Sequence, residues 1–208
     1  MTEQVDFEMA LSPQFFCEFE IDVAQWKGKF EERLALPALC RILGEEEFAK
    51  VFFAWAPEGL YFFVHATSSP WKVAYPNFET GDALELFIDT KNLKSVRTTH
   101  RFAHHFVFLP ERVEGISAKE ITRFRSEDRH ELCACNDVEV ETKKTREGYE
   151  MKIHIPASSL TGYEPDVGSF LGFCYRIHRA GGRPQHFGLA LKGPLEFHPY
   201  LWSSVKLS

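Results

Sequence analysis

The side chains in this sequence that could do chemistry are mainly histidines, and six of the nine histidines form two groups. The two groups are His100, His104 and His105, followed by His178, His186 and His198. An imidazole can ligate a metal ion or transfer protons near neutral pH. Successive side chains of a strand point to opposite faces, so His104 and His105 cannot both ligate one ion from a regular strand. His105, His178 and His186 could converge with Glu85 into a metal or acid–base site, and ordinary exposed or hydrogen-bonded histidines are the alternative.

A polar, glycine-rich loop between residues 179 and 187 is a second candidate for ligand contact. Its two glycines would let the backbone approach a ligand closely. Arg179, Arg183 and Gln185 could then read an anion or a sugar. A connector that binds nothing is the alternative.

The common sequence patterns of enzymes are absent. The chain contains no GxSxG elbow, P-loop, HExxH helix or dinucleotide fingerprint. Glu85 and Asp89 would share a strand face, but their separation of roughly 13 Å is too large for the carboxylate pair of a glycosidase. The sequence therefore favours a binding protein with no catalytic residues, and the alternatives are a metal-dependent enzyme built on the histidines, a haem- or redox-binding sandwich, or an interaction domain without a ligand.

Composition and charge favour one all-β domain over residues 1–208. Of the 208 residues 44% are hydrophobic and 20 are phenylalanine, and large aromatic side chains favour strands. The formal net charge of −6 argues against a nucleic-acid partner. No apolar run approaches the length of a membrane span.

The amino terminus and the cysteines predict a cytoplasmic location. The first residues have neither the basic region nor the apolar region of a secretory signal. The five cysteines are odd in number and lack the spacing of a disulfide framework. Cys133 and Cys135 would share a strand face and could bind a soft metal, but no second pair accompanies them, so we interpret all five as reduced cysteines.

Apolar runs of strand length, separated by turn residues, predict an antiparallel two-sheet β-sandwich of jelly-roll type. The predicted strands are 15–21, 49–55, 60–66, 83–89, 104–109, 138–145, 149–155, 171–178 and 201–207. Short helices are predicted at 39–48 and 111–122, with one helical turn at 157–160. Pro110 is expected to close the strand before it.

Alternation along these strands predicts which side chains leave the core. If Leu84, Leu86 and Ile88 face inward, then Glu85, Phe87 and Asp89 face outward. By the same reasoning the outward side chains of 171–178 include Cys174, Arg176 and His178, while His105 and Val107 leave the core of 104–109. A carboxylate beside arginine and histidine donors suits a ligand rich in hydroxyl groups. A Glu85–Arg176 pair that only cross-links the sheet is the alternative.

Four segments together resemble the family 9 carbohydrate-binding modules. Residues 53–62 (FAWAPEGLYF) are similar to the family's strand, turn and hairpin, and 81–89 (GDALELFID) to its D-x-[VL]-E-[VIL]-F-I-D strand. Residues 148–156 (GYEMKIHIP) are similar to its GY-x-x-E-x-x-IP strand, with methionine where the acidic residue often stands. Residues 168–178 and 199–207 resemble its two closing strands. The resemblance covers roughly residues 45–207 in the expected order.

The resemblance implies a sandwich that binds a carbohydrate or related polyol on an open, concave sheet face. It implies ligand contacts from Glu85, His105, Arg176 and His178. The family clamps its sugar between two tryptophans, but the matching positions here fall near Glu79 and at 195–197. Aromatic substitutes, which could be Trp71, Phe78 and Phe197, would have to replace them, while Trp202 is expected in the core. Structural calcium is a further possibility from the resemblance, with candidate ligands Glu79, Asp82 and Asp89.

Overall fold

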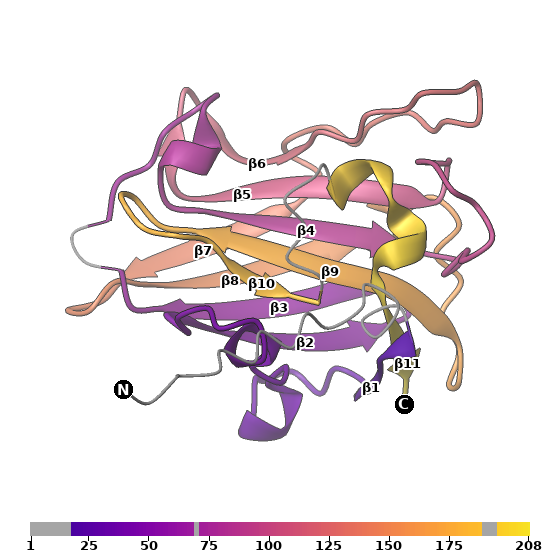
Figure 1. Ribbon diagram of the computed structural model, residues 1–208, viewed down its shortest axis with the longest axis horizontal. Coiled ribbons are helices and arrows are strands. Elements are labelled where there is room, and N and C mark those ends of the chain that lie inside the picture. The colour runs from indigo at the N-terminus through magenta and orange to yellow at the C-terminus, as the bar shows by residue number, and fades with distance from the viewer. Residues whose placement is uncertain (1–17, 69–70, 189–194) are drawn as a thin grey trace, which may run out of the picture.

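The chain folds into two β-sheets packed face to face, in a computed structural model that describes residues 18–68, 71–188 and 195–208 (Figure 1). The strands of the larger sheet are β1 (Glu20–Val23), β4 (Ala83–Asp89), β5 (Ala103–Val113), β6 (Ile116–Glu120), β9 (Phe170–His178), β10 (Gln185–Phe187) and β11 (Ser203–Leu207). The strands of the smaller sheet are β2 (Ala49–Ala56), β3 (Gly59–Ala66), β7 (Glu139–Lys144) and β8 (Tyr149–Pro156). The predicted all-β sandwich is confirmed.

The larger sheet runs in the order β1-β11-β9-β4-β5-β6. The short strand β10 pairs with the same edge of β9 as β11 does, farther along that strand. The smaller sheet runs in the order β2-β3-β8-β7. Neighbouring strands are antiparallel with one exception, because β1 runs parallel to β11. The predicted antiparallel pairing therefore holds for the other neighbouring strands, and the β1–β11 pair at the edge departs from it.

Aromatic side chains fill the space between the sheets. Phe53 and Phe62, a cross-strand pair of β2 and β3, stack with their ring centroids 4.4 Å apart, and Phe53 also lies 4.9 Å from Phe173 of the opposite sheet. The inward set Leu84, Leu86 and Ile88 belongs to the same core. Period-two alternation therefore predicted the faces of β4 correctly.

The helix predictions were mostly wrong. Residues 111–122, predicted as a helix, form the end of β5 and all of β6. Pro110 does not end β5, because it lies where the β5–β6 register shifts, and a residue without an N–H is tolerated at such an irregularity. Residues 39–48 contain only the 3₁₀ turn η2 (Leu39–Arg41), whereas the predicted turn after β8 is present as η4 (Ala157–Ser159).

The described residues also contain four further 3₁₀ turns of three residues each, which are η1 (Glu32–Leu34), η3 (Phe78–Thr80), η5 (Leu195–Phe197) and η6 (Pro199–Leu201). None of the helices in this part of the chain is long and apolar enough to cross a bilayer.

Two loop segments cover the outer face of the larger sheet. Residues 71–82 pack on the side chains of Ala83, Val107 and Leu109. Residues 195–202 pack on Phe87 and its neighbours at the other end of β4, and Figure 1 shows their yellow turns lying over this sheet. Trp202 is buried, as expected, and it packs in this second hydrophobic cluster on the outer side of the larger sheet.

Candidate functional site

Four polar side chains meet on the outer face of the larger sheet, between the two covering segments. They are Glu85 of β4, His105 of β5, and Arg176 and His178 of β9. Arg176 is the direct cross-strand partner of Glu85. His105 pairs with Phe87 and His178 with Ala83, so each histidine is a diagonal neighbour of Glu85, within reach of a long side chain. We call these four residues the Glu85 quartet.

The carboxylate of Glu85 accepts all the hydrogen bonds within the quartet. Its Oε1 lies 2.5 Å from Nε of Arg176 and 2.7 Å from Nε2 of His178. Its Oε2 lies 2.7 Å from Nε2 of His105. An ionised carboxylate can only accept, so both histidines donate through Nε2–H.

Burial and hydrogen bonding shift the pKa of Glu85 in opposite directions. Desolvation by itself would raise the pKa of Glu85, but the hydrogen bonds from His105, His178 and Arg176 hold it well below its usual range. Desolvation would also lower the pKa of Arg176, whereas Glu85, together with the charges of Glu196 and Glu79, raises it above its usual value. The pair is therefore ionised throughout the physiological range.

The quartet is buried, which corrects the prediction of an open, hollowed face. Glu85 is 0% exposed, and only Arg176 reaches solvent to a substantial extent, with 16% of its side chain accessible. The outward-facing Phe87 is also fully buried, stacked on His105 at 4.2 Å. The face is covered because residues 71–82 and 195–202 fold across it.

The segments that flank the quartet carry aromatic side chains at the positions where an aromatic clamp was expected. Phe78 meets the imidazole of His178 edge-on, with centroids 6.1 Å apart. Phe197 lies under the guanidinium of Arg125, which is 3.8 Å from its ring centroid. Both phenylalanines are half-buried.

Three other residues predicted to bind a ligand do not join the quartet. Trp71 packs edge-on against the core residue Tyr149, with centroids 5.9 Å apart, and Lys144 lies over its ring. Arg183 is exposed in the loop after β9. Gln185 is buried and points towards the smaller sheet, where its Oε1 accepts from the backbone N–H groups of Phe48 and Ala49. Gln185 therefore ties the two sheets together.

The predicted convergence of histidines on Glu85 holds only in part. His186 turns away from the quartet and interacts through Nδ1 with Oε1 of Glu45, 2.7 Å away. His104 faces the opposite side of β5 from His105, as alternation predicted.

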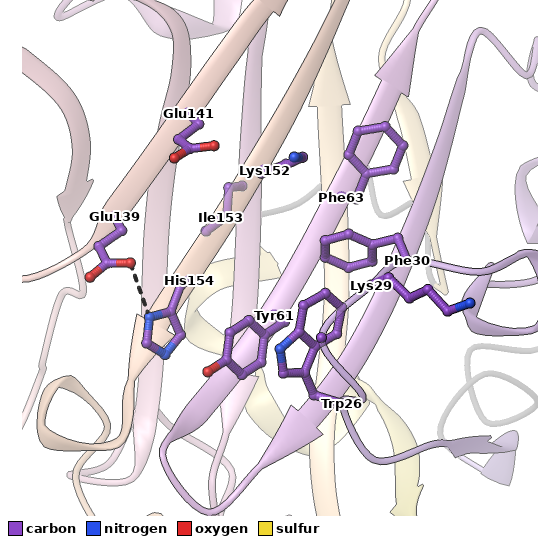
Figure 2. Close-up of a pocket in the computed structure, with 11 residues that line it drawn as sticks. Trp26, Lys29, Phe30, Tyr61, Phe63, Glu139, Glu141, Lys152, Ile153 and His154 are labelled. Atoms are coloured by element: carbon purple, nitrogen blue, oxygen red, sulfur yellow. Dashed lines mark hydrogen bonds and ion pairs between the residues drawn. The ribbon is translucent and has the colours of Figure 1, made fainter.

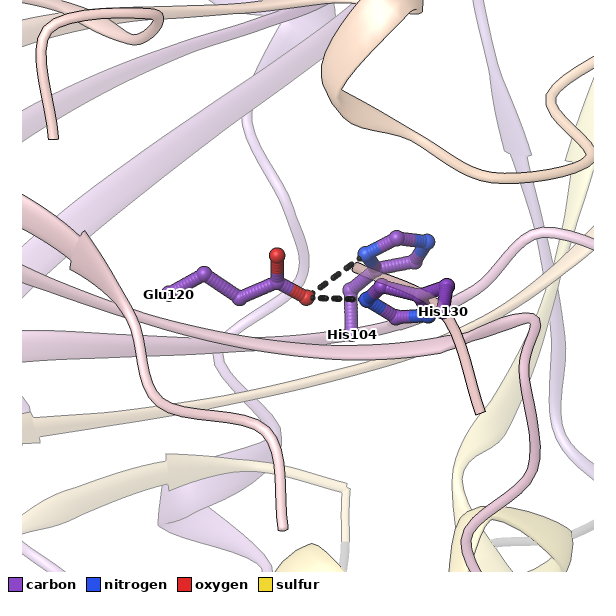
Figure 3. Close-up of side chains that lie close together, drawn as sticks. All are labelled: His104, Glu120 and His130. Atoms are coloured by element: carbon purple, nitrogen blue, oxygen red, sulfur yellow. Dashed lines mark hydrogen bonds and ion pairs between the residues drawn. The ribbon is translucent and has the colours of Figure 1, made fainter. Parts of the chain in front are cut away.

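His104 belongs to a second polar cluster that the sequence reasoning missed (Figure 3). His104 Nδ1 and His130 Nε2 each lie 2.8 Å from the same oxygen of Glu120, Oε1. Among the described residues this is the one group of three side chains whose donor atoms lie close enough together to hold a metal ion. Burial lowers the pKa of His104, whereas the hydrogen bonds to Glu120 oppose this shift.

Hydrogen bonds within the protein already occupy the Glu120 carboxylate. Thr122 Oγ1 also donates to Oε1, and the backbone N–H of Cys133 donates to Oε2. The arrangement ties the irregular segment 121–138 to β5 and β6. The sequence did not predict this role for Glu120, because residues 111–122 were predicted to form a helix.

Two of the three carboxylates considered for calcium, Asp82 and Asp89, form hydrogen bonds that stabilise loops. Asp82 is buried and accepts from the hydroxyl of Ser68 and the N–H of Lys72. Asp89 accepts from the N–H groups of Lys91 and Leu93, which closes the turn after β4. The four described cysteines are all free thiols, which agrees with the prediction for these four, whereas Cys17 lies outside the described residues.

Comparison with known proteins identifies the fold. No family model matches the sequence, and no curated protein matches it. A family 9 carbohydrate-binding module from Caldicellulosiruptor kristjanssonii, solved in complex with cellotriose, matches with a TM-score of 0.66 at 15% identity, over 91% of this chain and 94% of that chain. The chain has the fold of a family 9 carbohydrate-binding module.

Two further structures agree with this family 9 fold. A family 9 module from the same organism in complex with glucose has a TM-score of 0.66 at 14% identity, over 91% of this chain and 96% of that one. A Bacteroides uniformis protein proposed to bind carbohydrate has a TM-score of 0.53 at 10% identity, over 91% and 99% of the two chains. The likeness to these structures is therefore one of fold, at identities of 10–15%.

Proposed function

We propose that this chain is a single, non-catalytic module that binds a carbohydrate or related polyol at the surface above the Glu85 quartet. The fold supports this proposal, because two solved structures with the same fold hold cellotriose and glucose. The observation that carries it is the position of Arg176, held by a buried carboxylate and flanked by segments with half-buried phenylalanines.

Arg176 is the residue of the quartet that we expect to touch the ligand. Its Nε donates a hydrogen bond to Glu85, and its two terminal amino groups form no hydrogen bond with any of the described residues. These amino groups are therefore available to ligand oxygens. A guanidinium anchored at one edge keeps a defined orientation and loses little rotamer freedom when it binds. Glu85, His105 and His178 then act as positioning residues, because their buried side chains hold Arg176 in place.

Glu79 and Glu196 supply the complementary acceptors. Each lies on one of the two flanking segments, and the charge of each raises the pKa of Arg176. A sugar hydroxyl both donates and accepts, so one arginine between two carboxylates offers partners for both roles. The half-buried Phe78 and Phe197 suit the apolar C–H faces of a pyranose, since aromatic rings present a negative face.

Calorimetric titration with glucose and cellotriose tests the proposal. We expect saturable binding by the wild type, weakened about tenfold or more in Arg176→Ala, since a lost hydrogen bond to a charged group is worth about 1.5–3 kcal/mol. Arg129→Ala is the matched control, because Arg129 is exposed and has only a long contact with Glu127. Glu79→Gln and Glu196→Gln repeat the test with milder surface changes.

Two results would count against the proposal. The first is the absence of saturable binding of either sugar to folded wild-type protein. The second is wild-type affinity in Arg176→Ala, Glu79→Gln and Glu196→Gln together, which would move the ligand to another surface.

A further inference from the structure

The outer face of the smaller sheet carries a groove that the quartet does not use (Figure 2). Its volume is about 590 Å³, which lies within the range of about 300–1,000 Å³ typical of small-molecule sites. One side is lined by aromatic residues and the other by acidic residues of β7. We call it the Trp26 groove.

The floor of the groove is made by outward-facing side chains of β3 and β8. Tyr61 and His154 are direct cross-strand partners, and so are Phe63 and Lys152. The rings of Tyr61 and His154 stack with centroids 4.4 Å apart and planes 8° from parallel. Cross-strand stacking of this kind holds both rings in one orientation before a ligand arrives.

The aromatic wall is added by the segment that follows β1. Trp26 stacks on Tyr61 at 4.7 Å with an interplanar angle of 10°, which extends the row of near-parallel rings to three. Phe30 stacks on Phe63 at 5.4 Å. Gly28 lies between Trp26 and Phe30 and has φ +82°, so the chain can turn there and return both aromatic side chains to the sheet.

The opposite wall is acidic. Glu139 and Glu141 are the cross-strand partners of His154 and Lys152, and Figure 2 shows both carboxylates on the side of the groove away from Trp26. Glu139 interacts with Nδ1 of His154 at 3.3 Å. Within the described part of the chain, neither Lys152 nor Glu141 forms an ion pair or a side-chain hydrogen bond, so both are available to a ligand.

The charges of the lining balance. Lys29 and Lys152 are the cations and Glu139 and Glu141 the anions, and Lys29 also pairs with Glu31 at the rim, 2.8 Å away. A phosphorylated ligand would meet two carboxylates, and a cationic ligand would meet two ammonium groups. A neutral ligand with both donors and acceptors meets no net repulsion.

We propose that the Trp26 groove is a second binding site, for a neutral saccharide, separate from the site proposed at Arg176. The apolar face of a sugar ring packs on the aromatic wall. Its hydroxyl groups donate to Glu141 and Glu139 and accept from Lys152. The two sites lie on the outer faces of opposite sheets, so one module can hold two sugar chains, or two stretches of one chain, at once.

The four tryptophans of the chain allow the two sites to be observed separately in one sample. Trp26 lines the groove, whereas Trp202 packs on Phe87 near the quartet and Trp55 is buried in the core. In protein labelled with ¹⁵N at tryptophan, the four indole N–H signals are followed during titration with glucose, xylose and cellotriose. The Trp26 signal is assigned by its loss in Trp26→Phe.

We expect the Trp26 signal to shift and saturate with at least one of the three sugars while the Trp55 signal stays in place. The shift should persist in Glu79→Gln and Glu196→Gln, and in Arg176→Ala where that variant remains folded, because these residues lie on the opposite sheet or on the segments that cover it. Glu141→Gln should weaken binding at the groove about tenfold, since it replaces a charged acceptor by a neutral one. Glu147→Gln is the matched control, because Glu147 is exposed in the turn of the same hairpin and does not line the groove.

The outcomes separate this inference from the proposed function. A Trp202 response without a Trp26 response overturns the groove and leaves the site at Arg176 standing. A Trp26 response without a Trp202 response, together with unchanged affinity in Arg176→Ala, supports the groove and overturns the site at Arg176. Tighter binding of glucose 6-phosphate than of glucose at the groove, or no shift of Trp26 with any of the three sugars, overturns the assignment to a neutral saccharide.

Discussion

Glu85 and Arg176 face each other across β4 and β9, and their hydrogen bond of 2.5 Å is made where the carboxylate has no contact with solvent. A buried ion pair adds little stability over a well-packed apolar pair, but removing one partner leaves the other charge buried without a counter-charge. The pair therefore places a strong constraint on Arg176, which is the residue that reaches the surface.

Replacing Glu85 should destabilise the fold markedly. Glu85→Ala leaves Arg176 without its charged partner and removes the acceptor of His105 and His178, so we expect a loss of about 3–5 kcal/mol in the free energy of unfolding. Urea denaturation followed by fluorescence measures it. Glu147→Ala, at an exposed position, should change the value by no more than about 0.5 kcal/mol. An equally small effect at Glu85 would mean that the carboxylate is not buried as described.

Acid should weaken the protein through its two buried carboxylates. The pKa of Glu85 and that of Glu120 are held below the usual range by histidine hydrogen bonds that outweigh desolvation. A carboxyl group with a lowered folded-state pKa contributes its full stability above the unfolded value of about 4.3 and loses it as the pH falls towards the folded pKa.

The free energy of unfolding should therefore decrease from pH 5 downward, as measured by urea titrations at a series of pH values. Glu85→Gln should have a shallower decrease over the same range, because one titrating group has been removed. A slope identical to that of the wild type would show that Glu85 does not contribute to it.

The Gln185 side chain should stabilise the packing of the two sheets. Its side-chain oxygen accepts from the N–H groups of Phe48 and Ala49, and its Nε2 donates to the carbonyl of Ala49 at 2.7 Å. Gln185→Ala leaves two buried donors unpaired, so we expect a loss of about 2–4 kcal/mol in thermal or urea unfolding. Gln25→Ala removes an exposed side chain of the same type and should be nearly neutral.

Removing His130 should loosen one segment without unfolding the sandwich. His130 connects the irregular segment 121–138 to Glu120 through Nε2 and to the carbonyl of Arg101 through Nδ1, 2.6 Å away. In His130→Ala we expect faster proteolysis and hydrogen exchange within 121–138 and little change in the strands. His65→Ala on the opposite sheet is the control. Uniformly faster exchange would instead indicate that the cluster supports the whole fold.

Local patterns in the sequence were sufficient to predict the strand faces. Alternation predicted that Glu85, Arg176 and His178 face away from the core and that Leu84 and Phe173 face inward, because side-chain direction on a strand follows from backbone geometry alone. The grouping of the three polar residues in one site was an expectation from the family resemblance. The sequence also predicted the hairpin of β2 and β3, because turn residues lie between two apolar runs there.

Contacts between residues distant in the sequence were decided only by the tertiary structure. Alternation cannot say that residues 71–82 and 195–202 fold over Glu85, or that Trp26 returns to stack on Tyr61. Nor does it bring His130 to Glu120. These contacts depend on where loops cross a completed sheet, and a loop's path is set by the surfaces available to it. The sequence therefore determined which face the polar quartet would occupy, and the packing of distant segments determined that this face would be covered and that the opposite sheet would carry a groove.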